Sequence, residues 1–492
     1  MKKSLLAIVM AVVILALSVG CNVGGGTAKR DAFEVPAEGF DTSKQISIQF
    51  YNTMGQSLTP VLEAYIIKFN ELYPNIEVKY TSVGGYDDVR DQIKNEITVG
   101  GQPNLAYCYP DHIASYNLAN AVTVIDNLID SKIEVERADG TKETIGLTSA
   151  QKADFIQGYY EEGRQFGDGQ MYSMPFSKST EVLYYNKTVF DKHGLQAPDH
   201  WWCDDSCPAD CKTSMEYVCR TLKTAYPNST PLGYDSESNW FITMCEQLGT
   251  PYTSATGKHF LFDTKENRAF VKRFNTWYKN GWLTTQELYG AYTSGLFINQ
   301  KDDKVSFMSI GSSAGATHQR PEKVEVTDEQ GGVTTKRPFE VGIVPIPQAD
   351  KTNKKVISQG PSVCIFNKDD PQEVIASWLF VKYLTTSVDF QAEFAAASGY
   401  VPVIKSVAEH PVYAANMAAA DGLENIAYLS AKVCLEQESY YFTSPAFNGS
   451  STARDQVGIL MKDCISLVDG DIDAQLATSF KNAIDECEYS AR

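Results

Sequence analysis

The segment GSSAG at residues 311–315 has the residue types needed for nucleophilic chemistry. It matches the pattern Gly-x-Ser-x-Gly, which in serine hydrolases exposes a nucleophilic serine at the turn after a strand, here Ser313. Such an enzyme also needs an acid and then a histidine further along the chain, but only His318 and His410 follow. Because His318 comes five residues later, too close for the usual order, the sequence disfavours a hydrolase.

A second group with chemical potential is the set of four cysteines at residues 203–219, namely Cys203, Cys207, Cys211 and Cys219. Thiols at short spacing can bind zinc or form disulfides. Their spacings of four, four and eight residues differ from the CxxC pairs typical of structural zinc sites. We therefore expect disulfides here, and the sequence leaves their pairing open.

A third group suits the binding of a hydroxyl-rich solute. Carbohydrates present apolar ring faces and hydroxyl edges, so their sites need aromatic side chains and strongly hydrogen-bonding groups but no nucleophile. A guanidinium group can hold a phosphate, a carboxylate or paired sugar hydroxyls. The aromatic candidates are Tyr86, Trp240 and Tyr400, and the polar candidates are Asp111, Ser179, Glu181, Ser312, Ser313 and Arg454.

The first part of the chain alternates between strand and helix patterns. This order predicts a largely parallel sheet with helices on its faces. Ligands of such sheets bind at the carboxyl ends of the strands, where Tyr86 and Asp111 lie. The expected strands cover residues 45–51, 76–81 and 105–109, and the expected helices begin near residues 60 and 86.

The centre of the chain contains a continuous β-branched and aromatic run at residues 182–185. Such a run predicts a strand that is covered on both faces, as in a parallel sheet. The polar residues 177–181 before it form either an ordinary turn or a hinge between two structural units. Further along, we expect strands at residues 304–310, 341–347 and 361–366, a surface excursion at 325–336 and a helix at 452–468.

The composition excludes several classes of function. The 492 residues are 43% hydrophobic and carry a formal net charge of −18, so the folded body offers no basic surface for nucleic acid or anionic membranes. We find no P-loop and no dinucleotide-binding fingerprint. We therefore expect no cofactor, no metal and no enzymatic activity.

The N-terminus has the pattern of a secretory signal. Lys2 and Lys3 precede an uncharged run at residues 5–20, which is shorter than the ~20 residues needed to span a bilayer. The sequence LSVGC that ends at Cys21 resembles a bacterial lipobox, in which the cysteine is lipidated. We expect a signal peptide at residues 1–20 and a flexible, lipid-anchored tether at residues 21–44.

Several segments in order resemble the extracellular solute-binding proteins, family 1, of carbohydrate ABC importers. The resemblance runs from about residue 45 to the end, with residues 203–219 as its main gap. It rests on KFNELYP at residues 68–74, GGYDD at 84–88, YSMPFSKSTEVLYYNK at 172–187 and the GYVP turn at 399–402.

This resemblance implies an α/β, two-lobe, type II periplasmic-binding-protein-like fold, with ligand bound between the lobes. The family's three crossovers between the lobes match positions near residues 178, 360 and 400. We therefore expect lobe one at residues 45–177 and 361–399, and lobe two at 178–360 and 400–492, with 203–219 as a cysteine-rich insertion.

Within the family, the sequence looks most like glycerol-3-phosphate-binding proteins. That similarity implies that ligand is held by Tyr86, Asp111, Ser179, Ser312 or Ser313, Gly360, Tyr400 and Arg454.

The functional expectation is a monomeric, lipid-anchored receptor on the outer face of the cell membrane. It would capture a carbohydrate in the cleft between its lobes and deliver it to the permease subunits of an ABC importer. One alternative is a glycerol-3-phosphate or glycerophosphodiester receptor of the same fold. The alternative from another class is a secreted serine hydrolase that uses Ser313.

Overall fold

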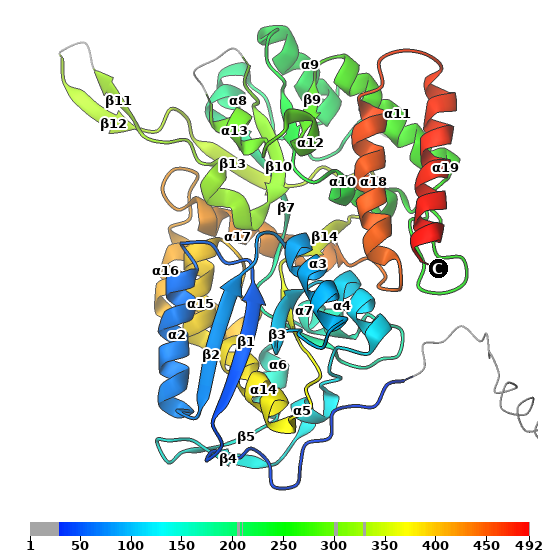
Figure 1. The fold of residues 1–492 in the computed structure, drawn as a ribbon. Coiled ribbons are helices and arrows are strands. Elements are labelled where there is room, and N and C mark those ends of the chain that lie inside the picture. The colour runs from blue at the N-terminus through cyan, green and yellow to red at the C-terminus, as the bar shows by residue number, and fades with distance from the viewer. Residues whose placement is uncertain (1–28, 204–206, 209, 300–303, 328–330, 492) are drawn as a thin grey trace, which may run out of the picture.

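The structure is a computed structural model that describes residues 29–203, 207–208, 210–299, 304–327 and 331–491. The predicted signal peptide and Cys21, the predicted lipidation site, lie outside the described residues. Two sheets with separate hydrophobic cores organise the rest of the chain, and we call the units built on them the first and the second lobe (Figure 1).

The first lobe is built on a five-stranded sheet in the order β2-β1-β3-β15-β6. β1 is parallel to β2 and β3, as the alternating sequence pattern predicts, whereas β15 is antiparallel to both β3 and β6. The strands are β1 (Ile46–Asn52), β2 (Ile76–Ser82), β3 (Leu105–Cys108), β6 (Ser173–Pro175) and β15 (Ser362–Ile365).

Helices cover both faces of this sheet (Figure 1). α2 starts with Pro60 in its first turn and buries Leu62, Tyr65 and Phe69 in the core, as its helical spacing predicts. The helices of this region are α2 (Thr59–Leu72), α3 (Tyr86–Ile97), α4 (Pro110–Tyr116), α5 (Asp126–Asp130), α6 (Ser149–Asp154), α7 (Gln157–Glu161), α14 (Pro371–Thr386), α15 (Val388–Ser398) and α16 (Pro411–Ala418). A small hairpin pairs β4 (Glu134–Glu136) with β5 (Lys142–Thr144).

The second lobe is built on a seven-stranded sheet in the order β16-β14-β7-β10-β8-β9, with β13 also paired to β7. β7 is buried along most of its length, as the apolar run predicts. Its neighbours β10, β13 and β14 are all antiparallel to it, so the prediction that it belongs to a parallel sheet is wrong. The strands are β7 (Ser179–Asn186), β8 (Leu232–Tyr234), β9 (Leu283–Thr285), β10 (Met308–Ser312), β13 (Val341–Pro345), β14 (Val356–Gln359) and β16 (Tyr441–Phe442).

The helices of this sheet region are α8 (Lys187–His193), α9 (Met215–Ala225), α10 (Glu237–Leu248), α11 (Lys265–Lys279), α12 (Gln286–Tyr289), α13 (Ser294–Ile298), α17 (Ile426–Glu436), α18 (Ser450–Ile465) and α19 (Ile472–Ser490). α18 and α19 lie side by side along one flank of the lobe (Figure 1).

Some boundaries differ from the sequence expectation. β10 begins at Met308 rather than at residue 304, and α18 begins at Ser450. The expected surface excursion at residues 325–336 contains the hairpin of β11 (Val324–Thr327) and β12 (Val333–Lys336), which projects from the second lobe (Figure 1).

The chain passes between the two sheets at residues 176–178, from β6 to β7, and at residues 360–361, from β14 to β15. Lys178 lies at the first passage and exchanges backbone hydrogen bonds with Val401. Val401 and Val403 pack in the core of the first lobe. The lobe boundaries that we expected, including the one near residue 400, stay a proposal.

The cysteines depart from expectation. All ten described cysteines are free thiols, so the disulfides expected at residues 203–219 are not formed in this structure. Cys219 is fully buried in the core of the second lobe. Because Cys219 packs in the core, it is not available to pair with Cys203, Cys207 or Cys211 in the loop.

Candidate functional site

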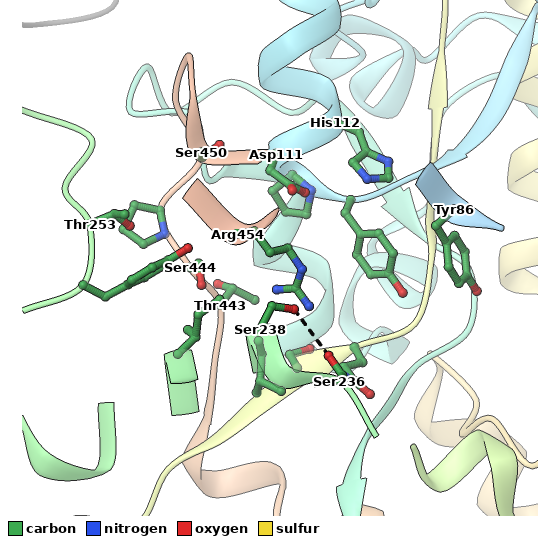
Figure 2. A pocket seen from close by; sticks show the side chains of 18 of the residues that line it. Tyr86, Asp111, His112, Ser236, Ser238, Thr253, Thr443, Ser444, Ser450 and Arg454 are labelled. Atoms are coloured by element: carbon green, nitrogen blue, oxygen red, sulfur yellow. Dashed lines mark hydrogen bonds between the residues drawn. The ribbon is translucent and has the colours of Figure 1, made fainter. Parts of the chain in front are cut away.

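A cavity of about 370 Å³ lies between the two lobes. Its walls come from both lobes and from the segments that join them, including Tyr86 and Asp111 on one side and Ser238 and Arg454 on the other (Figure 2). The volume falls in the range of roughly 300–1,000 Å³ usual for small-molecule sites. The fold therefore creates one pocket to which both lobes contribute.

The wall of the first lobe is aromatic. Tyr86 is the first residue of α3, and Tyr109 directly precedes Pro110 at the start of α4. Their rings meet edge to face with centroids 5.0 Å apart. The hydroxyl of Tyr86 lies 2.9 Å from that of Tyr400, so Tyr400 contacts the cavity wall through Tyr86.

The wall of the second lobe is rich in hydroxyl groups. Ser236 caps α10, and its Oγ accepts the backbone N–H of Asn239 at 3.3 Å. Its φ of 75° lies in the left-handed region, where a non-glycine residue is strained. Ser238 follows with its Oγ 3.4 Å from that of Ser236, the contact drawn in Figure 2. This turn presents both hydroxyl groups at the cavity.

Arg454 is the cation that α18 contributes to the cavity lining. Its guanidinium group donates to the side-chain oxygen of Asn239, and Figure 2 shows it between Asp111 and Ser238. Asn239 is buried in α10, so this hydrogen bond fixes the guanidinium group with its remaining donors available. Of the residues that we predicted to bind ligand, Tyr86, Asp111 and Arg454 line this cavity.

The carboxylates of Asp87, Asp111 and Glu162 also line the cavity. Glu162 is 3% exposed and is paired with Lys178 at 2.6 Å. The lining therefore contains both acceptors for hydroxyl groups and a donor for anions.

Three polar atoms of the cavity lining are buried without a hydrogen-bond partner among the described residues: Nδ1 of His112, Oγ1 of Thr253 and Oγ of Ser444. Burial lowers the pKa of His112, which favours its neutral form. Buried polar groups are normally paired, because an unpaired group costs about 1–3 kcal/mol. The three residues line the cavity, but these particular atoms are covered by neighbouring protein atoms.

The other predicted residues lie behind the cavity wall. Trp240 is fully buried and stacks on Tyr234 with centroids 4.6 Å apart, so its ring packs in the core of the second lobe. Ser179 is 2% exposed and lies within β7, where its Oγ accepts from Ser312 at 3.3 Å. Gly360 follows the lining residue Gln359. Their contact with a ligand stays a prediction.

Ser313 is not placed as a hydrolytic nucleophile. Its side chain is fully buried, and its Oγ accepts the backbone N–H of Thr180 at 3.2 Å. Its carbonyl oxygen accepts hydrogen bonds from the hydroxyl groups of Tyr184 and Ser430. These contacts give the turn a structural role in joining β10 to β7 and α17.

Sequence reasoning missed several cavity residues, above all Tyr252, Tyr292 and Ser236. Tyr292 is 65% exposed and lies between α12 and α13, whereas Tyr252 follows α10 in a loop. Neither residue lies at the end of an expected strand, which was the signal that we used. Of the segment from Thr443 to Arg454, the sequence analysis named only Arg454 as a ligand-binding candidate, whereas Thr443, Ser444 and Ser450 also line the cavity.

Two α/β lobes that share one polar and aromatic cavity define a protein that binds a solute between its lobes. The profile of the family described as bacterial extracellular solute-binding protein matches residues 64–421. This match covers well over half of the chain, which therefore belongs to that family.

The sequence is also similar to curated proteins. The sn-glycerol-3-phosphate-binding periplasmic proteins UgpB of Escherichia coli (strain K12) and Salmonella typhimurium are each 26% identical over 158 residues. The match takes in 32% of this chain and 33% of theirs, so it spans about a third of the length of these relatives. It confirms the similarity to glycerol-3-phosphate-binding proteins that we noted in the sequence.

Solved structures share the fold over most of the chain. UgpB from Mycobacterium tuberculosis in complex with glycerophosphocholine is 16% identical with a TM-score of 0.65, covering 90% of this chain and 98% of its own. The GacH receptor of Streptomyces glaucescens, solved unliganded and with acarbose, is 15% identical with a TM-score of 0.64 and covers 90% and 99%. The predicted type II periplasmic-binding-protein-like fold is confirmed.

The family is one of extracellular proteins, in keeping with the signal peptide that we predict at residues 1–20. Among the helices of the described residues, none has both the length and the apolar character that crossing a membrane requires.

Proposed function

We propose that this protein captures a carbohydrate between its lobes and delivers it to the permease subunits of an ABC importer. The observation that carries the proposal is the shared cavity, which is lined by residues of both lobes. A solute that fills it would touch both lobes, since Asp111 belongs to α4 of the first lobe and Arg454 to α18 of the second.

The lining suits a sugar. The rings of Tyr86, Tyr109, Tyr252 and Tyr292 offer apolar faces, while carboxylates and serine hydroxyls offer hydrogen bonds to ring hydroxyls. Glu162 is paired with Lys178 and Asp87 with Arg90, so the remaining lining charges of Asp111 and Arg454 balance each other, which suits a neutral solute. Asp111 supplies acceptors from the first lobe and Arg454 supplies donors from the second.

A second candidate ligand is glycerol-3-phosphate or a glycerophosphodiester. It is supported by Arg454 together with the N-terminal ends of α10 and α18, because Ser236, Ser238 and Ser450 line the cavity at these ends. Helix N-termini carry partial positive charge and bind anions. The UgpB relatives bear glycerol-3-phosphate in their name, which supports this candidate for our chain.

The proposed action is a population shift without covalent chemistry. A solute that contacts both lobes stabilises the form in which they are close, and the permease would recognise that form. The buried hydrogen bond of Ser313 to Thr180 supports this mode over hydrolysis, since the hydroxyl is neither exposed nor free. The receptor would act as a monomer, with no cofactor and no nucleic acid partner.

We further propose lipid anchoring at Cys21 on the outer face of the cell membrane. The support is the LSVGC motif after an uncharged run. Replacement of Cys21 by Ala should abolish incorporation of labelled palmitate and release the protein into the soluble fraction. Retention of label in that variant would contradict the proposal.

A thermal-shift screen of sugars, glycerol-3-phosphate and glycerophosphodiesters tests the binding function. A solute at 100 times its dissociation constant should stabilise the protein by about 2.7 kcal/mol, enough to raise the melting temperature measurably. No response to any of them, together with ester turnover that is lost in Ser313→Ala, would favour the hydrolase instead.

Variants of Arg454 then separate the two ligand classes. Loss of a hydrogen bond from a charged group costs about 1.5–3 kcal/mol, so Arg454→Ala should weaken binding of a phosphate by roughly 10- to 100-fold. Arg454→Lys, which keeps the charge, should restore phosphate binding in part. For a neutral sugar, both variants should weaken binding alike, because only the geometry of the donors is lost. Titration calorimetry measures each case.

A further inference from the structure

The loop between α8 and α9 gathers four side chains that can bind a metal. Nε2 of His200 lies 3.7, 3.6 and 3.5 Å from the Sγ atoms of Cys203, Cys207 and Cys211. All four ligand atoms lie within 4.8 Å of one another. Three thiols and one imidazole at a common centre form a Cys₃His set, which is a common structural zinc site.

The distances fit a tetrahedral zinc ion. With Zn–S near 2.3 Å and Zn–N near 2.0–2.1 Å, regular tetrahedral angles place nitrogen and sulfur about 3.5–3.6 Å apart. The three measured nitrogen-to-sulfur distances are 3.5–3.7 Å. The nitrogen-to-sulfur distances are therefore those of a tetrahedral zinc site, and all four ligand atoms lie within 4.8 Å of one another.

His200 is oriented for this role by its neighbours. Its Nδ1 lies 2.6 Å from Oδ1 of Asp199, so the Nδ1–H donates to the carboxylate and the lone pair of Nε2 faces the thiols. The other carboxylate oxygen of Asp199 accepts from Lys351 at 2.7 Å. Metal-binding histidines are typically held by such a carboxylate, which raises their basicity.

The backbone around His200 is equally well fixed. His200 is 4% exposed, and its backbone forms isolated β-bridges with Ser214 and Gln348. Its carbonyl accepts the backbone N–H of Met215 at 2.8 Å, at the start of α9. The imidazole is thus held by the backbone of the second lobe, and the loop that carries the three cysteines begins and ends close to it.

We propose that His200, Cys203, Cys207 and Cys211 bind one structural zinc ion. Four protein ligands leave no open position for substrate, so the ion would stabilise and not catalyse. α8 and α9 lie on the side of the second lobe that faces away from the first lobe (Figure 1). The ion would therefore tie the loop to its lobe without contact with the solute.

The spacing argument that favoured disulfides assumed Cys219 as the fourth ligand, but Cys219 is buried in the core. Without it, the thiols number three, and one disulfide would leave the third thiol unpaired. Both chemistries are open to an extracellular protein, so the experiment must distinguish them.

The test is the metal content of the full chain purified without chelators and analysed by plasma mass spectrometry. We expect about one zinc ion per chain. Cys207→Ala should reduce the zinc content to background, whereas the matched control Cys219→Ala should retain it. Replacement of zinc by cobalt should give the thiolate charge-transfer and d–d absorption of a tetrahedral site.

A measurement on the unaltered chain guards against misfolding of the variants. Removal of zinc with a strong chelator should lower the melting temperature, and added zinc should restore it. Background zinc in the unaltered chain, with an intact mass lower by two hydrogen atoms, would show a disulfide and overturn the proposal. Full zinc content in Cys207→Ala, or a melting temperature indifferent to zinc removal, would overturn it as well.

Discussion

The ion pair of Lys178 and Glu162 shows how single residues hold the passage between the lobes. Lys178 is 0% exposed, and its Nζ also donates to the carbonyl of Gly360 at 3.1 Å. A buried pair contributes little net stability, but removal of one partner leaves the other charge uncompensated. The ion pair therefore fixes the position of the passage between the lobes more than it adds to the free energy of unfolding.

Lys178→Met should lower the free energy of unfolding by about 3–5 kcal/mol, because the carboxylate of Glu162 stays buried without its partner. Urea denaturation measures this loss. The exposed pair of Lys481 and Asp485, at 2.6 Å with 70% and 56% exposure, is the matched control. Lys481→Met should cost less than about 1 kcal/mol. Equal losses in the two variants would contradict the assignment of a buried, uncompensated charge.

Glu181, which is buried in the second lobe, makes the free energy of unfolding depend on pH. Burial raises the pKa of Glu181 to about 8 from 4.5, although Tyr234 donates to it at 2.7 Å. Between pH 4.5 and about 8, Glu181 is therefore protonated in the folded state but ionised in the unfolded state. The free energy of unfolding falls as the pH rises through this window, by at most about 1.4 kcal/mol per pH unit. Glu181→Gln should flatten this slope. Denaturation between pH 5 and 8 measures it, and an unchanged slope would exclude Glu181 as its source.

At the residue scale, the sequence predicts those site residues whose position follows from local order. Tyr86 and Asp111 open helices directly after strands, and Arg454 is implied by the family resemblance. Trp240 and Tyr252 show the limit, because whether an aromatic ring faces a core or a cavity depends on helices distant in sequence. His200 was missed because its partners, unlike those of a CxxC motif, surround it only once the loop is folded.

At the scale of elements, β7 shows what an apolar pattern can and cannot specify. The continuous apolar run at residues 182–185 predicts that both faces of the strand are covered, which the structure confirms. The direction of its neighbours depends on connections to β10, β13 and β14, which lie more than a hundred residues away. The first sheet was more predictable, because its three parallel strands follow one another with single helices between them.

The turn from β14 to β15 depends on Gly360. Its φ is +87°, and a Cβ there would lie 2.4 Å from the carbonyl oxygen of Ser177 in the neighbouring passage. Gly360→Ala should therefore cost the strain of a left-handed residue, about 1–3 kcal/mol, and a steric penalty in addition. Gly140→Ala is the matched control, since Gly140 has a φ of +81° but open space around it. Thermal melting of the two variants compares them, and equal losses would contradict a steric role at the passage.

At the scale of the whole molecule, the lobes touch beside the cavity through Arg90 of α3. Its Nη1 donates to Oγ of Ser451 at 2.7 Å and lies 3.6 Å from the carboxylate of Asp455, both on α18. The Arg90 side chain is 11% exposed, so these contacts are partly shielded from water. Burial raises the pKa of Asp455 to about 6 in spite of Arg90. This contact would favour the close arrangement of the lobes even before a solute binds.

Arg90→Ala should therefore shift the ligand-free protein toward open forms. Small-angle scattering should show a larger radius of gyration than for the unaltered chain, and saturating solute should remove the difference, because the solute bridges the lobes by itself. The apparent dissociation constant should rise by the factor by which the closed population falls, although Arg90 does not line the cavity. Lys481→Ala, on the exposed face of α19, controls for loss of a surface charge. A lower affinity with an unchanged radius would mean that Arg90 acts on the site itself and not on the equilibrium between open and closed lobes.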